Sequence, residues 1–167
     1  MGCYSVTRAC PCGYYTDPRK ECRCTPQQIR QYQARISGPL LDRIDIHIDV
    51  PSITYRDLAA ESGGEASTSV RERVNRVRDL QKKRFNNQTT MCNARMSNRQ
   101  IKEFCQIDED SERLIEMAVD RLGLSARAYT RILKVARTIA DLEEEKNVHS
   151  YHISEAIQYR SLDRRMI

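Results

Sequence analysis

Four of the chain's seven cysteines fall in one short stretch, CPCGYYTDPRKECRC, which runs from Cys10 to Cys24. They form two Cys-x-Cys pairs, Cys10 with Cys12 and Cys22 with Cys24. A zinc ion takes four thiolate or imidazole ligands in a tetrahedron, and two short pairs separated by a loop can supply them. Because the commoner zinc knuckle is Cys-x-x-Cys, two interpretations stay open: a structural zinc site, or a loop of reduced thiols without metal. No general base stands at a recognisable spacing, so we expect no catalytic thiol.

Two arginines stand at boundaries between predicted elements. Arg43 follows the turn SGPLLD and precedes an alternating apolar segment. Arg127 falls in the first turn of a predicted helix, where a cation opposes the helix dipole. An arginine in either place is more often an exposed or ion-paired side chain than a catalytic one. By themselves, these two positions only hint at a function.

A strongly basic helix is predicted over residues 68–85, TSVRERVNRVRDLQKKRF. Its cations surround much of the helix, which usually indicates a solvated surface. The alternative is a path for a DNA backbone, where each neutralised phosphate adds salt-sensitive affinity. The residues that we single out for DNA contact are Arg71, Arg78, Lys82 and Lys83.

The composition indicates a helix-rich protein with a small core. The chain has 167 residues, of which 31% are charged and 6% aromatic, with no tryptophan and a net charge of +5. No apolar run approaches the roughly 20 residues of a membrane span, and no signal peptide is recognisable, so we expect a cytoplasmic protein without membrane contact. Thiols stay reduced in that compartment, and an odd count of seven cysteines also argues against a closed disulfide framework.

Periodicity and capping residues place the elements. Thr25 and Pro26 predict the start of a helix, and helical patterns follow over 97–105, 108–123 and 125–145 and from near Ser150. The alternation in DIHIDV predicts one strand over residues 44–50, which Pro51 closes. A single strand is not stable alone, and the rest of the sequence offers no convincing partner for it.

The motifs resemble those of a known family. CPCGYY, CRCTPQQIRQYQARISGPLLDRIDIHIDVP, LSARAYTRILKVARTIADLEE and HISEAIQYR together are similar to the magnesium-chelatase-like AAA+ ATPases of bacteria, the ComM/YifB family. The similarity runs from about residue 10 to residue 160. It implies the C-terminal part of such a protein: a mainly α fold, with the end of the AAA+ α/β core (one strand and an arginine-finger helix) followed by an all-α lid bundle.

The resemblance assigns roles to the two arginines. Arg43 aligns with the arginine finger, which acts in trans on the neighbouring subunit, and Arg127 aligns with the sensor-2 arginine that contacts nucleotide on its own subunit. Both roles imply the chain's own upstream ATPase core and a homo-oligomeric ring, most simply a hexamer. The family's cofactors, ATP and Mg²⁺, would be bound in that longer parent protein, because nothing here matches the P-loop G-x-x-x-x-G-K-[ST]. We therefore expect the chain to be inactive as an ATPase by itself.

One departure from the family leaves the sensor-1 residue unassigned. The family has Asn-Pro-Cys-Pro-Cys-Gly where this chain reads RACPCG, with Arg8 at the asparagine position. We divide the chain into a core remnant with the cysteine loop (1–56), a linker and basic helix (57–96) and the lid (97–167). The function that the resemblance implies is an ATP-driven DNA helicase or branch-migration ring in competence and recombination. The alternative is a stand-alone, zinc-stabilised helical module that binds DNA or protein without ATPase activity.

Overall fold

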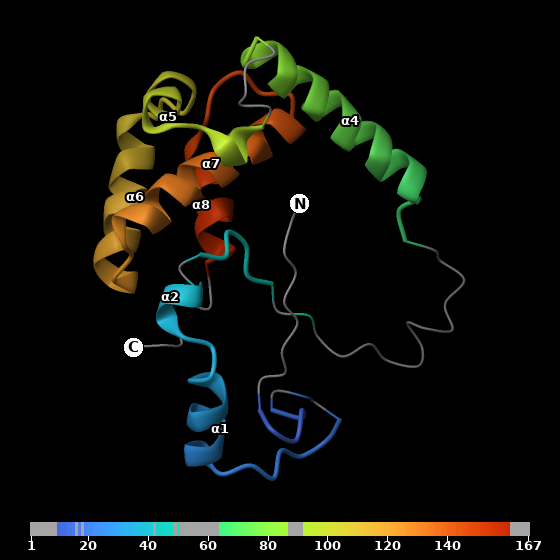
Figure 1. The fold of residues 1–167 in the computed structure, drawn as a ribbon, viewed down its shortest axis with the longest axis vertical. Helices are drawn as coiled ribbons and strands as arrows, with labels where there is room; N and C mark the ends of the chain where they lie inside the picture. Colours follow the sequence, from blue (N-terminus) through green and yellow to red (C-terminus); the bar gives the residue numbers. More distant parts are fainter. Residues whose placement is uncertain are drawn as a thin grey trace.

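The computed structural model describes residues 10–15, 17, 19–41, 43–48, 50, 64–86 and 92–160. The predictions that concern Arg8 and the rest of residues 1–9 lie outside this part. The elements follow one another along the chain as shown in Figure 1: α1 (Pro26–Gln33), α2 (Gly38–Leu41), α4 (Ser67–Arg84), the short 3-10 helix η1 (Asn93–Arg95), α5 (Asn98–Phe104), α6 (Glu109–Leu122), α7 (Ala126–Leu142) and α8 (Ser150–Gln158).

Side-chain caps fix the starts of α1 and α7, as the sequence predicts. Thr25 accepts a hydrogen bond from the Gln28 backbone N–H at the start of α1, with Pro26 as the first helical residue. Ser125 caps α7 in the same way. Gly123 ends α6 with a φ of 58°, a left-handed conformation that glycine adopts without steric cost.

The core lies in the C-terminal bundle, where α7 packs against α5 and α8, and α8 also packs against α6. Figure 1 shows α7 crossing the centre of this bundle. Small residues allow the close approach, since Ala136 and Ala140 of α7 are completely buried. Larger apolar side chains fill the rest of the core, namely Phe85, Met96, Ile101, Ile115, Ile132, Leu133, Ile139, Val148, Ile153 and Ile157.

Helix α4 joins this bundle at its C-terminal end. Val77, Gln81 and the following Phe85 are buried there, whereas Val70 and Val74, near the other end, are 37% and 44% exposed. Figure 1 shows the N-terminal half of α4 extending away from the bundle. The valine stripe that the sequence places on one face is therefore only partly covered.

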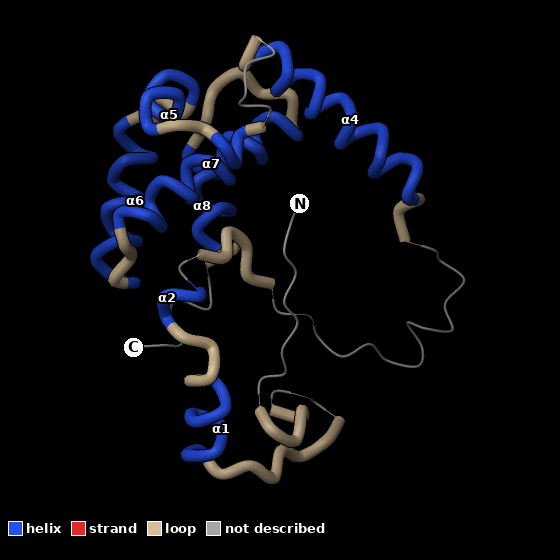
Figure 2. The backbone as a smooth tube through the Cα atoms, viewed as in Figure 1, coloured by secondary structure: helices blue, strands red, loops and turns tan. Residues whose placement is uncertain are grey.

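The strand predicted over 44–50 is not formed in the described residues of that segment, and Figure 2 shows helix and loop alone throughout the described chain. Polar and apolar residues alternate along the segment, but three of the apolar side chains are exposed rather than buried. His47 is buried, whereas Ile46, Ile48 and Val50 are 47%, 68% and 78% exposed. A strand requires a neighbouring strand as its hydrogen-bonding partner, and the part of the chain that the structure describes supplies none.

The mainly α architecture with a C-terminal helical lid is confirmed. None of the helices in the described residues combines the length with the apolar composition that crossing a bilayer requires.

Candidate functional site

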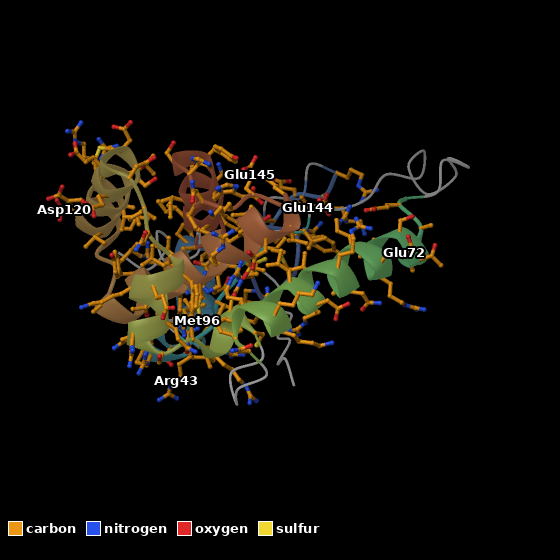
Figure 3. The ribbon with its side chains drawn as sticks, turned by 90° about the horizontal axis from the view of Figure 1, so that it is seen from above. Arg43, Glu72, Met96, Asp120, Glu144 and Glu145 are labelled. Atoms are coloured by element: carbon orange, nitrogen blue, oxygen red, sulfur yellow. The ribbon has the colours of Figure 1, made fainter. Side chains whose placement is uncertain are left out.

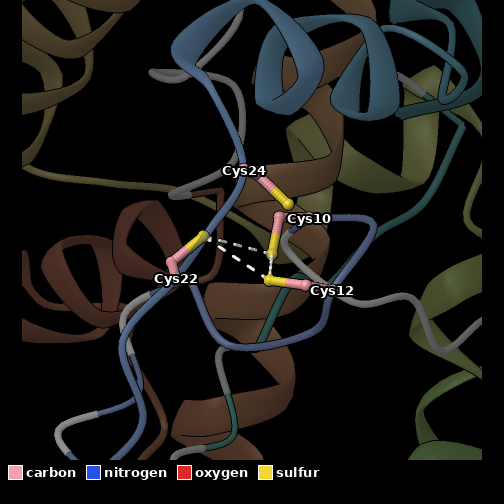
Figure 4. A group of neighbouring side chains, drawn as sticks. All are labelled: Cys10, Cys12, Cys22 and Cys24. Carbon is pink, nitrogen blue, oxygen red and sulfur yellow. Dashed lines mark hydrogen bonds between the residues drawn. The ribbon is translucent and has the colours of Figure 1, made fainter.

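The four clustered cysteines come together in space, as Figure 4 shows. Their sulfur atoms all lie within 4.8 Å of one another. The Sγ atoms of Cys10 and Cys12 are 3.3 Å apart, those of Cys12 and Cys22 3.6 Å, and those of Cys10 and Cys22 3.8 Å. In a tetrahedron with zinc–sulfur bonds of about 2.3 Å, sulfur atoms are separated by about 3.8 Å. The arrangement therefore fits a zinc ion.

Backbone amides surround the cluster with positive partial charge. Gly13 and Tyr15 donate their N–H groups to the Cys10 sulfur, at 3.2 and 3.3 Å. A hydrogen bond from the Tyr14 backbone lowers the pKa of Cys12 to about 6, against the effect of burial and with the help of the neighbouring thiols. Such donors favour the thiolate, which is the form that binds metal.

The thiols of Cys22 and Cys24 hold their protons more tightly than that of Cys12. A backbone hydrogen bond from Cys24 lowers the pKa of Cys22, but burial and the neighbouring thiols outweigh it and raise the pKa to about 12. The pKa of Cys24 is also raised, although a backbone hydrogen bond with Cys12 opposes the shift. The cluster therefore resists becoming fully anionic unless a cation offsets the charge. Among the described residues, these cysteines are the one group of three or more His, Cys, Asp or Glu side chains placed to hold a metal ion.

Arg43 lies just after α2 with its side chain exposed. Seen from above, it points outward at the edge of the molecule (Figure 3). Its own backbone N–H donates to the Leu40 carbonyl at 3.0 Å, which continues the turn of α2. The turn thus presents the guanidinium to the surroundings, where it is available to a neighbouring molecule.

The segment after Arg43 is attached to the bundle through its backbone. Arg131 of α7 donates to the carbonyl oxygen of Arg43 at 2.5 Å and also bonds the Asp45 carboxylate. Arg160 donates to the Ile44 carbonyl at 2.5 Å. The His47 N–H donates to the Tyr159 carbonyl at 2.7 Å. Side chains and backbone of the lid thus take the place of a neighbouring strand.

Arg127 lies at the N-terminal end of α7 and lines an open cavity of about 740 Å³. Two further cations of α7, Arg131 and Lys134, line the same cavity. Asp45, Ile46 and Ile48, in the segment that follows Arg43, also line the cavity. The structure therefore brings the segment after Arg43 to the cavity that Arg127 lines, although Arg43 itself is not part of the lining.

The proposed DNA-contacting side chains are all exposed on α4. Spacings of seven and four residues place Arg71, Arg78 and Lys82 on a common face of the helix. Lys82 also forms an ion pair of 2.9 Å with Asp79. Lys83 faces a different direction, since it lines a groove between α4 and α7. The four candidates therefore do not form a single surface.

A buried polar network that the sequence analysis missed connects α4, η1 and α7. Asp141 is 1% exposed and accepts two hydrogen bonds from Arg84, at 2.5 and 2.6 Å, and one of 2.7 Å from Asn93. Arg137, four residues earlier on α7, donates to the same carboxylate at 3.1 Å. The signal available in the sequence is an acid and a base spaced by four on an otherwise apolar helix face.

Two other missed residues, Arg131 and Arg160, carry the contacts to the Arg43 segment. Arg131 follows the predicted sensor-2 residue by one helical turn, which places both on one face of α7. Nothing in the local sequence around Arg160 distinguishes it from an ordinary arginine at a helix end.

Family models and individual relatives both show that the chain is similar to magnesium-chelatase-like proteins. Residues 64–160 match the family described as magnesium chelatase, subunit ChlI C-terminal, and residues 4–58 match magnesium chelatase, subunit ChlI. Competence protein ComM of Haemophilus influenzae is 41% identical over 155 residues, which cover 92% of this chain and 29% of the relative. The YifB protein of Salmonella typhimurium is 39% identical over 158 residues, covering 94% of this chain and 30% of the relative. The chain spans less than a third of the length of these curated relatives.

Proposed function

Because the chain belongs to the magnesium-chelatase-like ComM/YifB family, we propose that it supplies the arginine finger and the sensor-2 lid of an AAA+ ATPase ring. In this proposal Arg43 reaches the nucleotide of the neighbouring subunit, and Arg127 contacts nucleotide across the cavity below α7. An upstream P-loop core holds the ATP phosphates and Mg²⁺. The ring, most simply a hexamer, drives a DNA helicase or branch-migration activity in competence and recombination.

The observation that carries the proposal is the placement of the two arginines. Arg43 is exposed on a turn whose following carbonyls are fixed by the lid, and Arg127 faces a cavity large enough for a phosphate-bearing ligand. A guanidinium offers a planar set of donors that matches phosphate geometry. During phosphoryl transfer such a group stabilises the charge that develops on the phosphate oxygens.

The first test is ATP hydrolysis by the chain alone and by a chimera. In the chimera, this chain replaces the matching C-terminal region of the Haemophilus influenzae relative, so that an upstream segment is supplied. We expect no turnover by the 167-residue chain and steady-state turnover by the chimera, measured as phosphate release. Hydrolysis by the purified chain alone, if it is lost in Arg127→Ala, would contradict the division of roles.

For the cysteine cluster we propose a structural zinc site, supported by the close approach of the four sulfur atoms, which all lie within 4.8 Å of one another. The chain purified in the presence of zinc should contain one equivalent of metal, measured by elemental analysis. Cys12→Ser should abolish binding, because removing one thiolate leaves an incomplete tetrahedron. Cys92→Ser is the matched control, since Cys92 is not part of the cluster, and it should retain the metal. A wild-type chain that is metal-free, with a melting temperature insensitive to chelator, would identify the thiols as unliganded.

The second candidate function is a zinc-stabilised binding module that contacts DNA or protein without hydrolysing ATP. It is favoured by the cysteine cluster together with the exposed cations of α4. The chimera decides between the two functions, because only the ATPase role predicts that Arg43→Ala abolishes its ATP turnover.

A further inference from the structure

The backbone that carries Arg43 and Ile44 is held by two cations of the lid, Arg131 of α7 and Arg160 just after the end of α8. We propose that Arg131 and Arg160 are positioning residues that fix Arg43 relative to α7 and α8. The inference rests on the proposed role of Arg43 as the arginine finger. It adds a physical link between that finger and the lid of the same chain.

We call the pair Arg131 and Arg160 the clamp, and Arg160 is its buried member. Its side chain is among the largest fully buried ones, with 1% of the residue exposed. Burying a guanidinium is unfavourable unless its N–H groups are hydrogen-bonded. One of them donates to the Ile44 carbonyl at 2.5 Å, and Ile44 directly follows Arg43. The cation therefore fixes the chain one residue after the finger.

Arg131 is the more accessible member of the clamp. Its side chain is 20% exposed, but that of Asp45 is 54% exposed, so water screens their ion pair from the carboxylate side and the pair contributes little by itself. The hydrogen bond to the Arg43 carbonyl is the specific element, because it fixes the peptide group of the finger residue. Together the two cations hold consecutive carbonyl groups, those of residues 43 and 44. The Arg43 side chain is left free to reach outward.

The clamp joins the finger to the helix that begins beside Arg127. Arg131 lies one turn after Arg127 on the same face of α7, and both line one cavity with Asp45. A movement of α7 that follows phosphate binding at Arg127 therefore also displaces the backbone of Arg43. In a ring, this couples the nucleotide sensed by the lid to the finger that the chain presents to its neighbour.

Amide hydrogen exchange on the 167-residue chain tests the clamp directly. Arg131→Ala should speed exchange in a peptide covering residues 43–48 by about tenfold or more, because a hydrogen bond to a charged group is lost. Arg131→Lys should restore part of the protection, since it keeps one donor and the charge. Arg113→Ala, which removes an exposed arginine of α6, is the control and should change nothing in this peptide. Unchanged exchange of residues 43–48 in Arg131→Ala overturns the clamp.

Turnover by the chimera tests positioning. Arg131→Ala should lower kcat by about 10²-fold, the scale expected when a catalytic group is misplaced by about 1 Å, with little change in ATP affinity. Arg131→Lys should recover part of the loss. If Arg43→Ala abolishes turnover and Arg131→Ala does not reduce it, the positioning role is wrong while the finger stands. If Arg43→Ala itself leaves turnover intact, the finger assignment fails, and exchange alone decides whether the clamp exists.

Discussion

Replacing Arg43 by alanine should lower ATP turnover of the chimera by about 10³-fold or more, the magnitude that arginine fingers contribute to phosphoryl transfer. ATP binding should stay nearly unchanged, because the proposed contact forms with the neighbour's nucleotide and strengthens in the transition state. Phosphate release measures turnover, and a fluorescent nucleotide measures binding. Arg30→Ala on α1, an exposed arginine outside the proposed site, is the matched control and should keep full activity.

Mixed rings separate action in trans from action in cis. Subunits with Arg43→Ala are combined with subunits whose upstream P-loop lysine has been replaced, so that neither kind is active alone. If the finger acts in trans, some interfaces then join an intact P-loop to an intact Arg43, and part of the activity returns. Mixed rings that stay inactive would contradict the trans assignment.

Replacing Asp141 by alanine should have the largest effect on stability. The carboxylate is buried between Arg84 and Arg137, and its removal leaves two guanidinium groups in the core without their counter-ion. Breaking a buried ion pair by removing one partner costs about 3–5 kcal/mol, a large share of the stability of a small domain. Urea unfolding followed by far-UV circular dichroism measures the loss. Asp79→Ala on exposed α4 removes a carboxylate that is paired only at the surface and should leave the midpoint nearly unchanged.

The same carboxylate makes stability depend on pH. Burial works to raise the pKa of Asp141, but the hydrogen bonds from Arg84 and Asn93 outweigh it, and the pKa is lowered. A lowered folded-state pKa contributes stability above the ordinary aspartate value of about 3.9, and this is lost as pH falls through the folded value. Wild-type protein should therefore lose stability over this acidic range more steeply than Asp141→Asn. Parallel pH profiles for the two proteins would show that the network does not carry this dependence.

The helices could be predicted because their signals are local. Thr25 and Ser125 as caps, and Gly123 as a stop, act through bonds within one turn of their own positions, so sequence order alone reveals them. The prediction of a strand over 44–50 was wrong because strand pairing depends on distant residues rather than on local ones. The alternation in this segment is real, but pairing requires backbone partners from another segment, and here Tyr159 and Arg160 supply them instead.

In the candidate site, too, the features set by nearby residues could be predicted, and those set by distant residues could not. Cys10, Cys12, Cys22 and Cys24 are near in sequence, so their spacing already predicted a cluster, and folding only had to close one loop. The resemblance to a known family identified Arg43 and Arg127, but it did not reveal how Arg43 is held. That information lies in Arg131 and Arg160, which are 88 and 116 positions away from their carbonyl partners.

The sequence by itself determined the helical class, the capped helix starts, the family and the residues of the cysteine cluster, because each depends on neighbours within a few positions or on long motifs. Only the tertiary structure decided which arginines anchor the Arg43 segment, that Asp141 is buried among cations, and that Ile46 and Ile48 stay exposed and line an open cavity. These features depend on contacts between distant segments, whose partners are chosen when the core packs and every buried polar group must find a hydrogen bond.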